Sequence, residues 1–140
     1  MLYRLTVGLI LVCLASSAAQ ACRGEFDERT IIFDEAPTSL DAPVVVEATI
    51  VDRSEDIDAA TGLGWAVMNG RIDRVIRGSV DIGPLKIVTE FWDCTTGFGA
   101  GSHGIVVGTL RRDAQGPPEL VAIQESNSAR RMRKAREQAK

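Results

Sequence analysis

The sequence predicts an all-β domain, a small five-stranded barrel or sandwich, within a chain of 140 residues. Two observations lead to this fold class. Five segments rich in β-branched and other apolar residues follow one another, and the connections between them contain Gly, Pro and charged residues. No amphipathic helical pattern separates these segments, so a fold of alternating strands and helices is not expected.

The first 21 residues have the pattern of a secretory signal. Arg4 is followed by the apolar stretch 5–14, which is too short to span a bilayer, and Ala19-Gln20-Ala21 has the small-x-small pattern of a cleavage site. We therefore expect residues 1–21 to be a signal peptide that is removed on export. The mature protein is then periplasmic or extracellular, and a retained membrane anchor is the alternative.

Export has a consequence for the cysteines. Cleavage after Ala21 leaves Cys22 and Cys94, because Cys13 belongs to the signal peptide. In an oxidising compartment, two cysteines in a small chain predict one disulfide, which would contribute about 4 kcal/mol by constraining the unfolded chain. Lipidation of Cys22, which would tether the protein to a membrane, is the alternative.

Charge is distributed unevenly along the mature chain. Residues 22–129 contain 18 acidic and 9 basic residues, whereas residues 130–140 contain six basic residues and one acidic residue. An acidic domain is an unsuitable partner for nucleic acid, so none is expected. The basic tail is a candidate contact for an anionic surface through Arg130, Arg131, Arg133, Lys134 and Arg136.

The mature chain divides into three parts. Residues 22–43 are expected to form an irregular N-terminal arm, in which residues 31–33 are a candidate short strand. Residues 44–125 form the barrel domain, and residues 126–140 a basic helix or tail. The expected barrel strands are 44–52, 65–76, 85–92, 105–110 and 119–124, with a bulge at Gly70 and a solvated acidic loop at 52–64.

The C-terminal segment contains good helix formers, and Ser126 or Ser128 is suited to cap its start. Its apolar side is thin, so we expect a loosely attached helix. The apolar positions are Ala129, Met132, Ala135 and Ala139.

The order of these segments resembles the netrin-type module, the OB-fold domain shared with tissue inhibitors of metalloproteinases. The resemblance covers residues 22–125 and is carried by Cys22, by the strand segments 41–48, 74–78, 85–89 and 104–108, and by Cys94. It implies a five-stranded OB-like barrel and a bond from the N-terminal cysteine to the one beyond the third strand. It also implies metalloprotease inhibition. However, the inhibitors begin with Cys-x-Cys, whereas Arg23 and Gly24 follow Cys22, so the second bond of their zinc-binding wedge is missing.

Catalytic and metal-binding patterns are weak in this sequence. His103 is the single histidine, and a disulfide would occupy both mature cysteines, so zinc has few ligands and neither a metal nor a cofactor is expected. Glu90 and Asp93 are the acid pair that a small carboxylate-dependent hydrolase could use. No other feature singles them out, so an enzyme is the alternative function.

Non-catalytic binding of a protein, peptide or glycan is the function that the sequence favours. OB barrels commonly bind ligands on one strand face and its loops, where aromatic side chains can stack on a sugar or peptide. Aromatic filling of the core is the other interpretation. The candidate ligand-binding residues are Trp65, Phe91, Trp92, Phe98 and His103.

Overall fold

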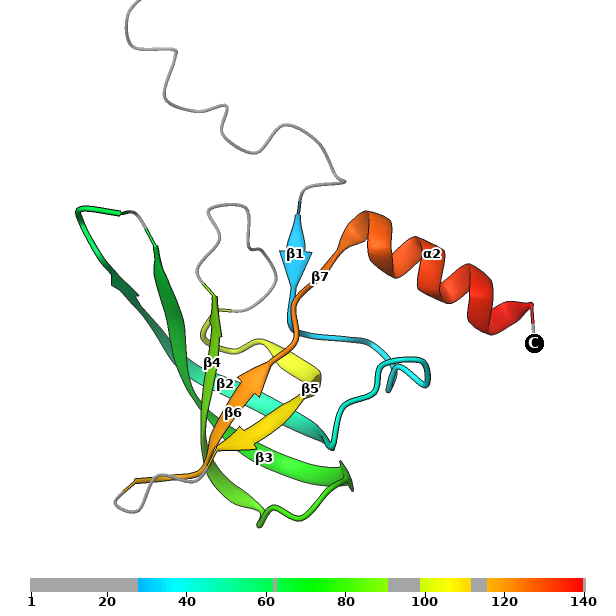
Figure 1. The fold of residues 1–140 in the computed structure, drawn as a ribbon. Coiled ribbons are helices and arrows are strands. Elements are labelled where there is room, and N and C mark those ends of the chain that lie inside the picture. Colours follow the sequence, from blue (N-terminus) through cyan, green and yellow to red (C-terminus); the bar gives the residue numbers. More distant parts are fainter. Residues whose placement is uncertain (1–27, 62, 91–98, 112–115, 140) are drawn as a thin grey trace, which may run out of the picture.

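The computed structural model describes residues 28–61, 63–90, 99–111 and 116–139. Five strands form a closed barrel, and a short two-stranded sheet and one helix lie beside it (Figure 1). The strands and the helix are β1 (Arg29–Thr30), β2 (Val44–Ile57), β3 (Gly64–Arg77), β4 (Gly83–Glu90), β5 (His103–Arg111), β6 (Glu119–Ala122), β7 (Glu125–Ser126) and α2 (Asn127–Gln138).

The order of the strands around the barrel is β2-β3-β4-β6-β5, and β5 closes the ring on β2. All neighbouring pairs are antiparallel except β4 and β6, which run parallel with Ile87 opposite Leu120. The predicted small five-stranded OB-like barrel with a C-terminal helix is confirmed. Since the barrel strands are paired all the way round, the hydrogen-bonding groups of β3, β4 and β6 are used within the barrel.

Alternating residues of the five strands fill the barrel, because successive side chains of a strand point to opposite faces. The arm adds one residue, Ile31, to this core. The buried residues of the barrel interior are Val44, Val46, Ala48, Ile50, Ala66, Met68, Ile72, Leu85, Ile87, Val106, Leu120 and Ala122.

The hairpin of β2 and β3 is longer than the sequence predicts. Residues 52–57 were expected in a loop, but they pair with residues 64–69, so the connection is confined to residues 58–63. The error has a physical reason: in β2 this segment extends from the barrel and its residues are exposed or half-buried on both faces, so it lacks apolar alternation (Figure 1). The predicted irregularity at Gly70 is present, but the extra residue is Val51 on β2, because Ile50 faces Gly70 and Asp52 faces Asn69.

The N-terminal arm covers one outer face of the barrel. Residues 31–33 do not form the predicted short strand: β1 lies just before them and pairs Arg29 with Ser126 of β7, while Phe33 makes a single bridge to Ile105. Phe33 and Ala42 then pack on the outer side chains of β2 and β5 in a second apolar cluster. None of the residues of this cluster belongs to β3, β4 or β6.

The helix begins where the sequence predicts. The Ser126 side chain accepts a hydrogen bond from the Ala129 amide and caps the first turn of α2. No residue of α2 is buried, as its thin apolar side predicts. Among the described residues, no helix is long and apolar enough to cross a membrane.

Candidate ligand-binding face

The outer face of β3, β4 and β6 has an apolar row at its centre. Val67 faces Val88 across the β3–β4 pair, and Val88 faces Val121 across the parallel β4–β6 pair. Trp65 lies two residues before Val67 on the same side of β3, with Glu90 opposite it. We call this surface, centred on these four apolar residues, the Trp65 face.

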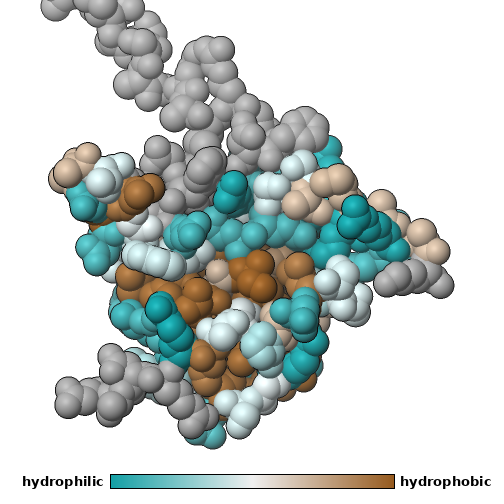
Figure 2. Space-filling view, in the orientation of Figure 1, coloured by the Kyte–Doolittle hydropathy of each residue, from teal (hydrophilic) through white to brown (hydrophobic). Residues whose placement is uncertain are grey.

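The Trp65 indole is exposed where a core residue would be buried. Its side chain is 42% exposed, so the interpretation that Trp65 fills the core is wrong. Figure 2 shows hydrophobic surface in the middle of the barrel, in the region of β4 and β6 in Figure 1, with hydrophilic surface around it. An exposed aromatic ring beside a small apolar patch is an arrangement suited to stacking on a ligand.

Two shallow hollows flank Trp65, and its side chain lines both of them. The first has a volume of ≈ 250 Å³ and the second of ≈ 240 Å³. The first is lined by Arg29, Trp65, Thr89, Glu90, Val121, Ala122 and Gln124. The second is lined by Asp56, Trp65, Val67, Lys86, Val88, Arg111 and Glu119.

Charged side chains are held in place at the second hollow. The Glu119 carboxylate forms ion pairs with Lys86 at 2.9 Å and with Arg111 at 2.6 Å. Lys86, followed by Arg111, lowers the pKa of the Glu119 carboxyl below its usual value. The group is therefore ionised at neutral pH, and this edge of the Trp65 face presents ordered hydrogen-bonding groups next to an aromatic ring.

His103 lies on a different part of the barrel from Trp65. His103 faces Thr49 of β2, whereas Trp65 faces Asp56, seven residues further along that strand. At about 3.3 Å per residue this is roughly 23 Å along the strand. The structure thus does not bring together the two described members of the predicted aromatic and histidine site.

The surroundings of His103 form a charged cluster on the outside of β2, β3 and β5. Its Nε2 atom lies 3.5 Å from a Glu47 oxygen and 3.8 Å from an Asp73 oxygen. The Thr49 hydroxyl donates a 2.6 Å hydrogen bond to Asp73 and is the main reason why the pKa of this carboxyl is lowered. Because the hydroxyl is bonded to the carboxylate and not to the imidazole, the cluster is not arranged as a nucleophile and base.

Several predicted site residues lie outside the described residues. These include the proposed disulfide partners Cys22 and Cys94, and Asp93 of the acid pair. Its partner Glu90 is exposed at the end of β4, and its backbone carbonyl accepts a hydrogen bond from the Gln124 amide. The remaining three are the aromatic residues Phe91, Trp92 and Phe98. Within residues 28–61, 63–90, 99–111 and 116–139, no group of three or more His, Cys, Asp and Glu side chains could hold a metal ion.

The basic helix contains a contact that the sequence analysis did not anticipate. Arg133 points from α2 toward the barrel end and makes two hydrogen bonds to Glu125, at 2.9 and 3.0 Å. It also pairs with Glu137 at 3.0 Å and stacks over the Phe33 ring at 5.6 Å from its centroid. Glu125 raises the pKa of the Arg133 guanidinium. Arg133 is therefore committed to holding the helix and is not available to an anionic surface.

The comparisons with known proteins return no match, whether to a family model, to a curated protein or to a solved structure. The class of the protein therefore comes from its topology: it is a small all-β protein with a closed OB-like barrel.

Proposed function

We propose that the protein is an exported, non-catalytic binding module whose Trp65 face takes a glycan. The observation that carries the proposal is the half-exposed Trp65 indole between two hollows, on the outer face of β3, β4 and β6. Sugar rings present apolar C–H faces to an indole and hydroxyl groups to charged side chains. Lys86, Arg111 and Glu119 supply such groups beside Trp65.

The pairing of the strands favours a glycan over an extended peptide at this face. A peptide that binds by adding a strand needs an unpaired strand edge. Here β3 lies between β2 and β4, and β6 lies between β4 and β5. A ligand on the Trp65 face would therefore contact side chains and not a free strand edge. Such a ligand would be recognised by stacking on Trp65 and by hydrogen bonds to side chains.

The test is a binding titration of the purified protein with soluble cello-, chito- and xylo-oligosaccharides, followed by calorimetry. Trp65→Ala should weaken binding by about tenfold, since an aromatic stacking contact contributes up to about 1.5 kcal/mol. Trp65→Phe keeps a stacking surface and should weaken it less. Leu63→Ala is the matched control, because Leu63 is exposed but lines neither hollow. Absence of saturable binding by every oligosaccharide, or equal loss in Leu63→Ala, would refute the glycan assignment.

The proposed export and cross-link have a separate test. The signal peptide pattern at 1–21 and the two remaining cysteines support an oxidised, cleaved protein. Intact mass of the exported protein, before and after reduction, should give a chain that starts at Cys22 and gains two hydrogens on reduction. A mass equal to the full translated chain would contradict cleavage, and an added lipid mass would identify Cys22 as an anchor.

A further inference from the structure

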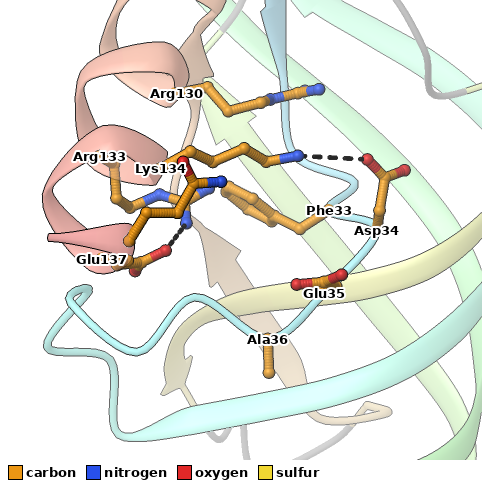
Figure 3. A pocket seen from close by; sticks show the side chains of 9 residues that line it. Phe33, Asp34, Glu35, Ala36, Arg130, Arg133, Lys134 and Glu137 are labelled. Carbon is orange, nitrogen blue, oxygen red and sulfur yellow. Dashed lines mark hydrogen bonds and ion pairs between the residues drawn. The ribbon is translucent and has the colours of Figure 1, made fainter. Parts of the chain in front are cut away.

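A cavity of ≈ 290 Å³ lies between α2 and the N-terminal arm, away from the Trp65 face (Figure 3). One wall is a face of the helix that carries residues 130, 133, 134 and 137, whose spacing of three and four places them together on one side. The opposite wall is the arm at residues 33–36. The two walls come from opposite ends of the described chain, so only the folded protein forms this cavity.

Part of the charge in the cavity is already neutralised. Arg133 makes three hydrogen bonds to the carboxylates of Glu125 and Glu137, which neutralise its charge. Glu137 in turn accepts hydrogen bonds from the Thr38 and Ser39 hydroxyls and from the Ser39 amide. These contacts join the helix to the arm and hold the two walls at a defined separation, without using the other charged residues of the cavity.

Arg130 also lines the cavity, and its side chain has N–H groups that make no hydrogen bond. Its Nε atom is buried and has no hydrogen-bond partner, and within the described residues the guanidinium makes no ion pair. Because the Nε atom is closed to solvent, it is also closed to a ligand, and the donors that Arg130 can offer to the cavity are its two terminal Nη groups. These two groups match the two oxygens of a carboxylate.

Lys134 and Asp34 complete the arrangement. Lys134 follows Arg130 by four residues, and its Nζ atom faces Asp34 across the cavity at 4.0 Å, the limit of an ion pair (Figure 3). The Asp34 side chain is 81% exposed, so this pair is weak and open to competition from a ligand. Glu35 adds a second carboxylate to the arm wall.

We propose that this cavity binds a small zwitterion of the α-amino acid class, with its carboxylate on Arg130 and Lys134 and its ammonium group on Asp34. The carboxylate accepts hydrogen bonds from the Arg130 Nη groups, and the ammonium group pairs with the exposed Asp34. A dianion such as phosphate is disfavoured because Asp34, Glu35 and Glu137 line the same cavity. The volume suits a ligand of this size.

The test uses amide chemical shifts of the purified protein, titrated separately with L-alanine, acetate, methylammonium and inorganic phosphate. L-Alanine should give saturable shifts confined to residues 33–36 and 130–138, with a dissociation constant in the millimolar range. Acetate should bind more weakly at the same residues, methylammonium more weakly still, and phosphate least. Phosphate binding tighter than L-alanine would overturn the zwitterion assignment, and absence of saturable shifts with all four probes would overturn the site.

Variants separate the two ends of the ligand. Arg130→Gln should weaken L-alanine and acetate binding by about ten- to hundredfold, the range for a hydrogen bond to a charged group. Arg130→Lys should not restore it, because lysine lacks the planar fork. Asp34→Asn should weaken L-alanine binding about tenfold and leave acetate binding no weaker.

Arg136→Gln is the matched control, since Arg136 is on the same helix but does not line the cavity. Arg136→Gln should bind L-alanine as tightly as the parent protein does. If it weakened binding as much as Arg130→Gln, the loss would come from the change in net charge, and the proposal would be refuted. The unfolding midpoint of each variant is measured alongside. Arg130→Gln should keep the parent midpoint because Arg130 makes no hydrogen bond or ion pair to the described residues, so a shift in its affinity reports the cavity itself.

Discussion

Replacing Arg133 by alanine removes the guanidinium that joins α2 to the end of the barrel. Arg133 and Glu125 form a two-bond pair, and their side chains are 10% and 7% exposed. Breaking such a buried pair by removing one partner costs about 3 to 5 kcal/mol, because the remaining charge is left buried and unpaired. Taken alone, loss of this pair would therefore lower the free energy of unfolding by about 3 to 5 kcal/mol.

The structure also limits this loss. No residue of α2 is buried, so little apolar surface opposes release of the helix from the barrel. Once the helix leaves, water can reach Glu125 and the penalty for the unpaired carboxylate disappears. We therefore expect the free energy of unfolding of Arg133→Ala to fall by about 3 kcal/mol at most, and α2 to lose its amide-exchange protection while the barrel strands keep theirs.

Urea unfolding and native-state hydrogen exchange measure the two effects. Arg136→Ala is the control on the same helix, and its free energy of unfolding should stay within about 0.5 kcal/mol of the parent value. The double variant Glu125→Leu/Arg133→Met should recover most of the loss, because an apolar pair does not leave a buried charge. A parent-like exchange rate in α2 of Arg133→Ala, or a double variant no more stable than the single one, would refute this account of the helix attachment.

Three further predictions concern pH and packing. Hydrogen bonds from Ser39 lower the folded-state pKa of Glu137 below its ordinary value of 4.5, so ionised Glu137 stabilises the folded protein above that pH, and this stabilisation is lost as the pH falls through the lower folded pKa. Urea unfolding from neutral to acid pH should therefore show a smaller pH dependence in Glu137→Gln than in the parent protein. An unchanged pH dependence would contradict this. Gly108→Ala should destabilise the barrel by about 1 to 3 kcal/mol, because the new Cβ atom would overlap the Val121 carbonyl oxygen. Gly99→Ala is the control and should be close to neutral, because a Cβ atom there has free space. Equal unfolding midpoints of the two variants would contradict the close approach of β5 and β6. Leu120→Ala should cost about 2 to 5 kcal/mol in thermal or urea unfolding, since Leu120 is fully buried in the barrel, and a loss below 1 kcal/mol would mean that β6 is not part of the core.

The fold could be predicted where local patterns carry it. The strand segments that line the barrel interior are rich in β-branched and other apolar residues, and Pro43 and Pro84 mark the starts of two of them. The outer half of β2 could not be predicted in this way. Its residues 52–57 are solvated on both faces, so backbone pairing with β3 holds them as a strand without any pattern in the side chains.

The candidate sites, like the fold, could be predicted only in part. Trp65 could be singled out as an aromatic residue at a strand end, but whether it filled the core or faced solvent depended on the register of β3 against β4. His103 could be singled out as the lone histidine, yet the register of β5 against β2 places it with Glu47 and Asp73, away from Trp65.

By itself the sequence determined the β-rich character of the chain, the approximate positions of its strands, a cap at Ser126 or Ser128 and the basic nature of the last helix, because each depends on residues close to one another in the chain. Only the tertiary structure decided the parallel pairing of β4 with β6, the barrel face that the arm covers, and the stacking of Arg133 over Phe33. Those features join segments that are distant in sequence, and the free energy that selects them arises only when the whole barrel has closed.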